Sequence, residues 1–195
     1  MSSKYTWENR FEEAALLIPW DRVESWFDVG CGTGRFFEKI AKADTNVLRE
    51  IFGVDVVDEN IAFAKKKLWP DSLTNRFTVM DIAELGDKVM DTFDLVTAIG
   101  VIYQCGIDPR SVIAAATRRI APGGTLIFTT ENPEFEGFFQ DPHGWYMEIE
   151  DLKVFLSALG GSYSLHLVNP LWREWSDDIN HKRNRFKEIF CKYSF

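Results

Sequence analysis

A short glycine-rich segment is the part of this chain whose residue types and spacing best fit a chemical role. It covers positions 27–35, reads F-D-V-G-C-G-T-G-R, and joins an apolar run to an amphipathic stretch. Glycines permit positive φ angles and let the backbone approach a ligand closely, while free N–H groups at the start of a helix attract a negative group. In α/β proteins such a turn, between a strand and a helix, is where nucleotides bind. The segment therefore predicts a site for a nucleotide-type cofactor.

The spacing of the glycines separates two classes of cofactor. A dinucleotide fingerprint needs glycine or alanine three residues after its second glycine, but Arg35 or Phe37 stands there in either frame. An NAD-linked oxidoreductase is therefore the weakest interpretation, and a purely structural turn is the alternative for the glycines taken alone. The form D-V-G-C-G-T-G instead resembles motif I of the class I S-adenosylmethionine-dependent methyltransferases. This resemblance implies S-adenosylmethionine as cofactor, S-adenosylhomocysteine as product, and contacts from Asp28, Gly30, Cys31, Gly32 and Gly34.

Two carboxylates further along the chain fit the same resemblance. The segment G-V-D-V-V-D places Asp55, followed by Val56, about 20 residues beyond the glycines, where the family binds both ribose hydroxyls. A helix cap is the alternative for Asp55, although Asp58 fills that role better. The segment F-T-V-M-D-I implies that Asp81 lies beside the adenine amino group and Ile82 against the ring. The alternative for Asp81 is a surface loop.

Two later segments complete the resemblance, which spans roughly residues 26–130. The run F-D-L-V-T-A-I-G-V-I-Y-Q, at 93–104, resembles motif IV, whose end borders the sulfonium and the substrate. It implies that Ile99 and Gly100 contact the cofactor, whereas we expect Asp94 to serve the fold. The run R-R-I-A-P-G-G-T-L-I-F, at 118–128, resembles the turn that leads into the fifth strand. We expect this turn to be structural.

Methyl transfer from a positive sulfur is an in-line displacement that asks little acid–base work of a protein. Alignment of the nucleophile in a pocket closed to water supplies most of the acceleration. The carboxylate of the cofactor needs a donor, and the resemblance makes Arg10 our candidate, with a plain surface arginine as the alternative. An acceptor hydroxyl or protonated amine would need a base, and His143 has a suitable unperturbed pKa. Tyr103 and Tyr146 are our other candidates for contact with the reacting groups.

The acceptor should lie over the ends of the fourth and fifth strands, where residues 101–106, 131–146 and 172–175 converge. The middle segment can form an aromatic-walled pocket with a few polar groups, as small-molecule sites often have. Core packing is the alternative for each of its rings. The residues concerned are Phe135, Phe138, Phe139, Trp145 and Tyr146, interleaved with Glu131, Asp141 and His143.

Two motifs of related methyltransferases are missing from the sequence, and their absence limits which metals and acceptors are expected. Glu131, Asn132 and Asp141 are too loosely arranged for the metal-dependent members of the family, so we predict no metal. The fourth strand runs into A-I-G-V-I-Y-Q rather than N-P-P-Y or D-P-P-Y. That departure speaks against methylation of a nucleobase or a glutamine. It favours an oxygen or nitrogen atom of a small metabolite, sugar or natural-product intermediate as the acceptor.

The elements that must position these residues alternate between strand and helix patterns, which predicts βαβ units on a parallel sheet. Seven strands are expected, the first five buried on both faces. Capping signals predict helices after Asp58, Asp108 and Asp151, the first two ending before Pro70 and Pro122. The predicted strands are 25–29, 51–56, 76–80, 93–99, 125–130, 163–168 and 188–193.

These elements predict a single class I methyltransferase domain over residues 1–195. Its fold would be a Rossmann-like three-layer α/β sandwich with a mostly parallel seven-stranded sheet and an antiparallel C-terminal hairpin. Residues 1–24, helical in composition over 5–17, would form a cap over the cofactor and substrate face. A methyltransferase-like binding subunit, which holds the cofactor and a protein partner without catalysis, is the alternative function.

The composition excludes several other classes. A formal net charge of −8 would repel nucleic acid, which normally needs a basic stripe. Three widely spaced cysteines form neither a zinc pattern nor a disulfide scaffold. No apolar run approaches the ~20 residues that cross a bilayer, and the N-terminus has no apolar signal core. We therefore expect a cytoplasmic monomer or homodimer that acts on a small molecule, without nucleic-acid or membrane partners.

Overall fold

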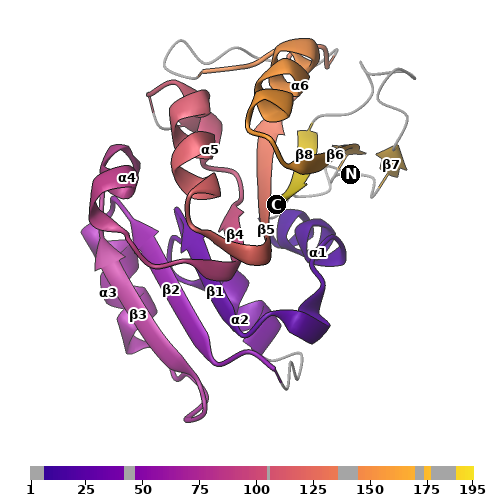
Figure 1. Ribbon diagram of the computed structural model, residues 1–195. Helices are drawn as coiled ribbons and strands as arrows, with labels where there is room; N and C mark the ends of the chain where they lie inside the picture. Colours follow the sequence, from indigo (N-terminus) through magenta and orange to yellow (C-terminus); the bar gives the residue numbers. More distant parts are fainter. Residues whose placement is uncertain (1–6, 42–46, 105, 136–144, 170–173, 177–187) are drawn as a thin grey trace, which may run out of the picture.

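One twisted sheet organises the chain in the computed structural model, which describes residues 7–41, 47–104, 106–135, 145–169, 174–176 and 188–195 (Figure 1). Within these ranges eight strands are ordered β3-β2-β1-β4-β5-β8-β6-β7. The first five pair in parallel and the last three are antiparallel. The strands are β1 (Ser25–Val29), β2 (Glu50–Asp55), β3 (Thr74–Val79), β4 (Phe93–Ala98), β5 (Ile120–Glu131), β6 (Ser162–Asn169), β7 (Glu174–Ser176) and β8 (Glu188–Ser194).

This topology confirms the predicted mostly parallel sheet with antiparallel C-terminal strands. All seven predicted strands are present, and β7 adds a three-residue strand next to β6. The strand order reverses between β1 and β4, which both pair with neighbours on opposite sides. Ligands of open α/β sheets bind beside such a reversal, at the carboxyl ends of the strands. The glycine-rich segment follows β1 at this place.

Helices cover both faces of the sheet and make three layers (Figure 1). The buried apolar residues divide into two clusters. One contains residues of α1, α2 and α3, and the other contains residues of α4, α5 and α6. The sheet therefore separates two hydrophobic cores. The helices are α1 (Trp7–Leu16), α2 (Arg35–Ala41), α3 (Asp58–Lys66), α4 (Leu85–Lys88), α5 (Pro109–Thr117) and α6 (Ile149–Ala158), with 3₁₀ turns η1 (Trp20–Arg22), η2 (Ile82–Glu84) and η3 (Ile102–Gln104).

Aromatic packing fixes α2, the helix that follows the glycine turn. Trp26 of β1 is fully buried and meets Phe36 and Phe37 of α2 edge-on, with ring centroids 4.8 and 4.4 Å apart. Buried aromatic pairs of this geometry contribute about 0.5–1.5 kcal/mol each beyond their burial. The start of α2, and hence the shape of the turn before it, is set by this contact with β1.

Several details of the predicted elements were wrong. Asp58 is the first residue of α3 and not its cap. Leu68, whose spacing from Ile61 and Ala64 predicted a place on the same face of the helix, is fully exposed after the helix has ended. The third strand is exposed along most of its length because it forms the edge of the sheet.

Two further boundaries also differ from prediction. Ile120 belongs to β5 and not to α5, and the expected turn at 122–124 is a bulge within β5, opposite Asp94. The helix predicted from Asp151 begins at Ile149. Asp108 is the cap of α5 as expected, since its side chain accepts the Arg110 N–H.

Asp94 serves the fold, as its position predicted. One of its carboxylate oxygens accepts the Glu24 and Ser25 N–H groups and the Ser25 hydroxyl, at 3.0, 2.9 and 2.9 Å. These hydrogen bonds connect the first residue of β1 and the residue before it to β4. We expect Asp94→Ala to lower the free energy of unfolding by about 1–3 kcal/mol, because these donors lose their acceptor. Urea unfolding measures this loss, and an equally stable variant would contradict it.

Candidate cofactor and acceptor site

The glycine turn has the backbone shape that its sequence predicts. Gly30, Gly32 and Gly34 have φ angles of 73°, 53° and 73°, in the region that side chains disfavour. The N–H groups of Gly30 and Cys31 both donate to the Val54 carbonyl, at 2.8 and 2.9 Å. These two hydrogen bonds therefore hold the turn against β2.

Two of these glycines lie in opposite surroundings. A Cβ on Gly30 would stand 2.5 Å from Cγ2 of Val101, which is the second residue after Ile99. A Cβ on Gly32 would have no atom within 4 Å. Gly30 thus allows the end of β4 to approach the turn, and Gly32 borders open space where a ligand can lie against the backbone.

Asp55 ends β2 and lies directly beside the turn. Its Oδ2 accepts the Gly32 N–H at 2.8 Å, and its Oδ1 accepts the Val57 N–H at 2.9 Å and the Asn60 amide at 3.2 Å. A carboxylate has about four acceptor positions, so one remains for a hydroxyl. The resemblance to the methyltransferase family predicted that two ribose hydroxyls bind here. In the structure, Asp55 also orders the turn and the start of α3, a role that had been assigned to Asp58.

Asp28 lies under the turn as a buried acid. Its Oδ1 accepts the Thr97 hydroxyl at 2.5 Å, and that hydroxyl oxygen accepts the Trp26 indole N–H at 2.7 Å. Burial raises the pKa of Asp28 from 3.8 to about 7; the bond from Thr97 lowers the pKa, and the charge of Asp55 raises it. Asp28 is therefore poised to change charge near neutral pH.

The residues expected around the adenine ring lie at the ends of β2 and β3. Asp81 is exposed, and its side chain accepts the Ala83 N–H, so it caps η2. Val56 is 65% exposed and Ile82 is half-buried against the core. These two apolar side chains therefore follow neighbouring strands, with Asp81 as the acidic group between β3 and η2.

The two residues that follow β4, Ile99 and Gly100, are buried. Ile99 is buried and belongs to the core beneath α1 and α2. Gly100 has a φ of 72°, and its N–H donates to the Thr129 hydroxyl at 2.7 Å.

The cysteine of the glycine turn, Cys31, is also buried, and burial raises the pKa of its thiol well above the ordinary value.

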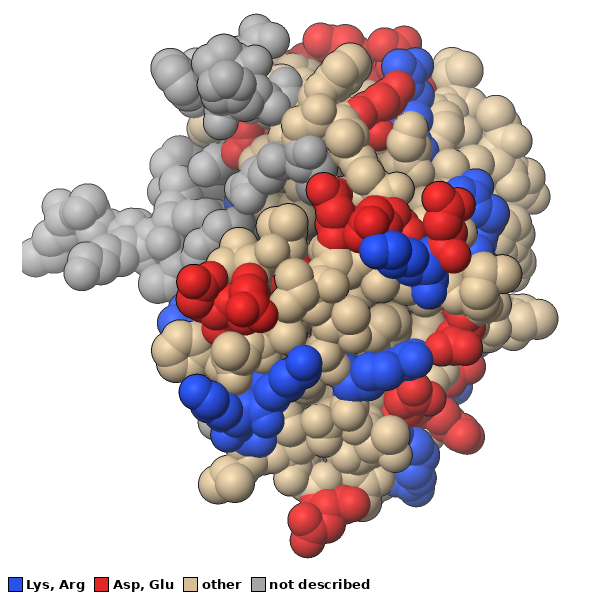
Figure 2. All heavy atoms as spheres, turned by 90° about the vertical axis from the view of Figure 1, so that its left-hand side faces the viewer, with Lys and Arg blue, Asp and Glu red and all other residues tan. Residues whose placement is uncertain are grey.

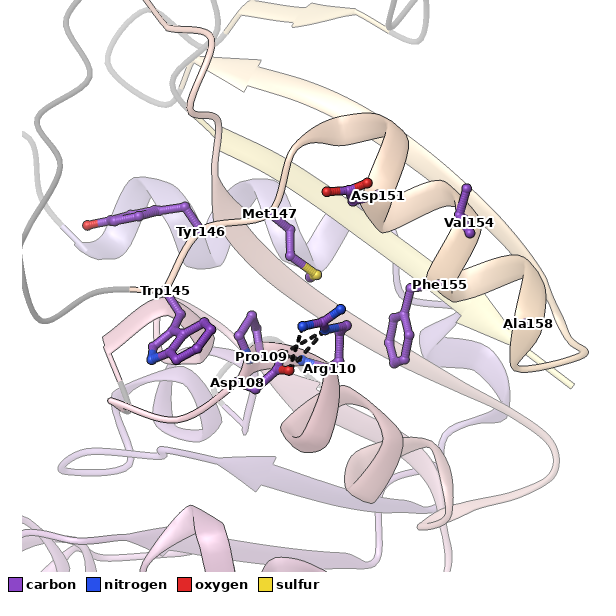
Figure 3. A pocket seen from close by; sticks show the side chains of 10 residues that line it. All are labelled: Asp108, Pro109, Arg110, Trp145, Tyr146, Met147, Asp151, Val154, Phe155 and Ala158. Atoms are coloured by element: carbon purple, nitrogen blue, oxygen red, sulfur yellow. Dashed lines mark hydrogen bonds and ion pairs between the residues drawn. The ribbon is translucent and has the colours of Figure 1, made fainter.

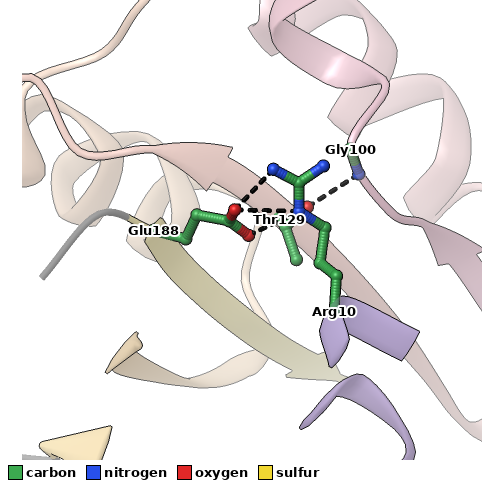
Figure 4. A network of polar contacts seen from close by, with 4 residues as sticks. All are labelled: Arg10, Gly100, Thr129 and Glu188. Carbon is green, nitrogen blue, oxygen red and sulfur yellow. Dashed lines mark hydrogen bonds and ion pairs between the residues drawn. The ribbon is translucent and has the colours of Figure 1, made fainter. Parts of the chain in front are cut away.

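Arg10 is neither at the surface nor isolated. Its Nε lies 2.8 Å from both carboxylate oxygens of Glu188, and its Nη2 lies 2.5 Å from one of them (Figure 4). Both side chains are nearly fully buried. The ion pair joins α1 to β8 next to Gly100 and Thr129. Sequence analysis missed Glu188, because no local pattern marks a partner that is 178 residues away.

A groove lies between α5, α6 and the segment 145–147 (Figure 3). Its volume is about 450 Å³. Trp145 and Tyr146 line it, and the backbone N–H of Trp145 donates to the Tyr103 carbonyl at 3.3 Å. Tyr103 itself is buried in η3 and is not in the lining. The remaining lining residues are Asp108, Pro109, Arg110, Met147, Asp151, Val154, Phe155 and Ala158.

The groove does not coincide with the cofactor turn, since no residue of 27–35 lines it. Arg110 and Asp108 are paired within it, at 2.8 Å between Nη2 and Oδ2, and this contact lowers the pKa of Asp108. Several expected acceptor residues, namely Phe138, Phe139, Asp141, His143 and Trp172, lie outside the described residues.

Charges of both signs are interspersed on the face that carries β3 and α4 (Figure 2). Ion pairs such as Arg76–Asp91 and Lys88–Glu84 account for part of this pattern.

Among the described residues, no cluster of three His, Cys, Asp or Glu side chains could hold a metal ion. No helix in the described ranges is both long and apolar enough to span a bilayer.

The reversal of strand order, the glycine turn and the acidic residue at the end of β2 together define a nucleotide-cofactor protein of the α/β class. A family model described as a methyltransferase domain matches residues 27–128. The chain therefore belongs to the methyltransferase domain family. The predicted class I S-adenosylmethionine-dependent methyltransferase architecture is confirmed.

Known proteins resemble the chain to different extents. It is 32% identical over 170 residues to a ubiquinone biosynthesis O-methyltransferase of Hahella chejuensis. That alignment covers 87% of the chain and 61% of the Hahella protein. It is 33% identical over 111 residues to the enzyme of that name from Methylococcus capsulatus, covering 57% of the chain and 45% of that enzyme. The chain thus spans about half the length of these relatives.

A solved structure supports the fold alone. The crystal structure of an S-adenosylmethionine-dependent methyltransferase from Clostridium acetobutylicum superimposes with a TM-score of 0.71 at 13% identity. The alignment covers 97% of this chain and 92% of that one.

Proposed function

We propose that this chain is an S-adenosylmethionine-dependent O-methyltransferase that acts on a hydroxyl group of a small molecule. The observation that carries the proposal is the glycine turn, with Gly32 open to a ligand and the Asp55 carboxylate beside it. The matched family supports methyl transfer, and the named O-methyltransferase relatives support transfer to oxygen. The match ends at residue 128, so the acceptor is inferred from the relatives and from the absence of an N-P-P-Y motif.

The donor set of the turn fits the cofactor. Backbone N–H groups near an open glycine suit a carboxylate, and Asp55 has one acceptor position for a ribose hydroxyl. Val56 and Ile82 offer apolar contact to a planar base, and Asp81 can accept from its amino group. Asp55, and Asp28 once it is ionised, place negative charge near a cofactor that carries a sulfonium and an ammonium.

The bound cofactor would supply an electrophilic methyl group. The chain's own residues would hold the cofactor and exclude water from it. Ile99 and Gly100 follow β4 at the border of the site, and the core to which Ile99 belongs contains residues of α1. Alignment of an acceptor oxygen in such a closed site is worth up to ~7–11 kcal/mol in favourable systems. We assign the removal of the hydroxyl proton to His143, and contact with the acceptor to Tyr103 and Tyr146.

Calorimetric titration with S-adenosylmethionine, S-adenosylhomocysteine and NADH tests the cofactor. We expect the first two to bind and NADH to give no heat. Incubation with S-adenosylmethionine and a panel of phenols and aliphatic alcohols, followed by mass spectrometry, tests the acceptor. Binding of the cofactor with no methylated product from any hydroxyl compound would favour the non-catalytic binding subunit.

We expect Asp55→Ala to weaken S-adenosylmethionine binding by about 1–3 kcal/mol, because a ribose hydroxyl and the Gly32 N–H both lose their acceptor. Asp55→Asn should lose less, since one side-chain oxygen remains to accept. Calorimetry measures both dissociation constants, and Asp94→Ala, which alters a carboxylate at the opposite end of β1, should bind as the wild type does. Unchanged affinity in Asp55→Ala would show that the ribose lies elsewhere.

A further inference from the structure

A buried hydrogen bond joins the segment that follows β4 to strand β5. Gly100 adopts a left-handed conformation, with a φ of 72°, and its N–H donates to the Thr129 Oγ1 of β5 at 2.7 Å. Both residues are buried. The next residue, Val101, is the one that approaches Gly30 of the cofactor turn. The position of this hydroxyl therefore determines where Val101 meets the turn.

The hydroxyl of Thr129 lies in buried surroundings. Glu131 pairs with Glu188 in the β5–β8 register, and Thr129 lies two residues before Glu131, so its side chain is on the same face of the sheet as Glu188. The Arg10–Glu188 ion pair covers that face, and Figure 4 shows the four residues together. Water is excluded there, because Arg10, Thr129 and Glu188 are each at most 2% exposed.

We propose that Thr129 is a positioning residue for the cofactor site. Its hydroxyl fixes Gly100, and Gly100 in turn directs Val101 against the glycine turn. Without the hydroxyl, a buried N–H is left unsatisfied and the Gly100–Val101 backbone must shift to find an acceptor. Such a shift moves the wall that faces Gly30. This inference rests on the proposed function, since it concerns binding of S-adenosylmethionine.

The test compares two substitutions that differ in one group. Thr129→Val keeps the volume and branching of the side chain but removes the hydroxyl, whereas Thr129→Ser keeps the hydroxyl and removes a methyl group. Calorimetry would measure the dissociation constant for S-adenosylmethionine, and urea unfolding would measure stability in parallel. We expect the valine variant to bind about tenfold more weakly, and the serine variant to stay within about twofold of the wild type.

The outcomes separate this inference from the proposed function. If the valine variant loses stability but binds the cofactor with wild-type affinity, Thr129 is only structural and the proposal is overturned. Equal weakening in both variants would also overturn it, because the hydroxyl would not be the cause. If the wild-type chain itself fails to bind S-adenosylmethionine, the proposed function fails first, and this inference falls with it. Should Thr129→Val not fold, Thr129→Ala and Thr129→Ser provide the same contrast.

Discussion

Gly30→Ala is expected to destabilise the protein by about 2–4 kcal/mol and to abolish measurable cofactor binding. Alanine in the left-handed region costs about 1–2 kcal/mol, and Gly30 has a φ of 73°. The added Cβ would also stand 2.5 Å from Cγ2 and 2.9 Å from Cβ of Val101, which adds the cost of an overpacked contact. Both the turn and the end of β4 must move. Urea unfolding and calorimetric titration measure the two effects.

Gly32→Ala is the matched control for this prediction. Its φ of 53° imposes a similar backbone cost, but no atom lies within 4 Å of the added Cβ. We expect a loss of stability of about 1 kcal/mol, with a large loss of affinity because the methyl group enters the open space. Adding Val101→Ala to Gly30→Ala should restore part of the stability, since the closest contact disappears. Equal stability of Gly30→Ala and Gly32→Ala would contradict the packing argument.

Asp28→Asn is expected to remove a dependence of stability on pH. The folded pKa of Asp28, about 7, lies above its ordinary value of 3.8, so the folded state holds a proton that the unfolded state releases. The resulting stabilisation is complete below about pH 4 and is lost as the pH rises through 7. At 1.36 kcal/mol for each pKa unit, the loss amounts to at most about 4 kcal/mol. Urea unfolding from pH 5 to pH 8 should show this slope in the wild type.

The asparagine variant should show a much shallower slope over the same pH range. Its side chain can still accept the Thr97 hydroxyl, and it never has to carry a buried charge. It should therefore gain stability relative to the wild type as the pH rises. Thr97→Ser keeps the donor to Asp28 and should retain the wild-type slope. Identical slopes in the wild type and Asp28→Asn would show that the buried carboxyl does not titrate in this range.

Local sequence patterns predicted the parallel part of the fold well. Buried strands read as apolar runs, and the glycine turn after β1 is visible from spacing alone. The Asp108–Pro109 start of α5 is equally local, because a cap and a first-turn proline are neighbours in sequence. The ends of the helices were predicted less well, since the cap expected at Asp58 and the end of α5 expected just before Pro122 were both wrong.

Other errors concern features set by distant parts of the chain. The third strand was expected to be buried on both faces, but its place at the edge depends on the order of all the strands. Asp55 was expected to bind the ribose, with a helix cap as the alternative, yet its carboxylate also accepts the N–H of Gly32, 23 residues away, and that of Val57. Glu188 and Thr129 were not singled out, because their importance arises only when β5, β8 and α1 meet.

The division of the interior by the sheet determines how substitutions elsewhere can disturb the glycine turn. The helix that follows the turn shares its core with α1 and α3, whereas the groove is built on α5 and α6, which belong to the other core. Val101, which faces Gly30, and Ile82 pack against that other core, so the cofactor site borders both. A change of packing among α5 and α6 can therefore reach the glycine turn through Val101, while a change in α2 acts on it directly.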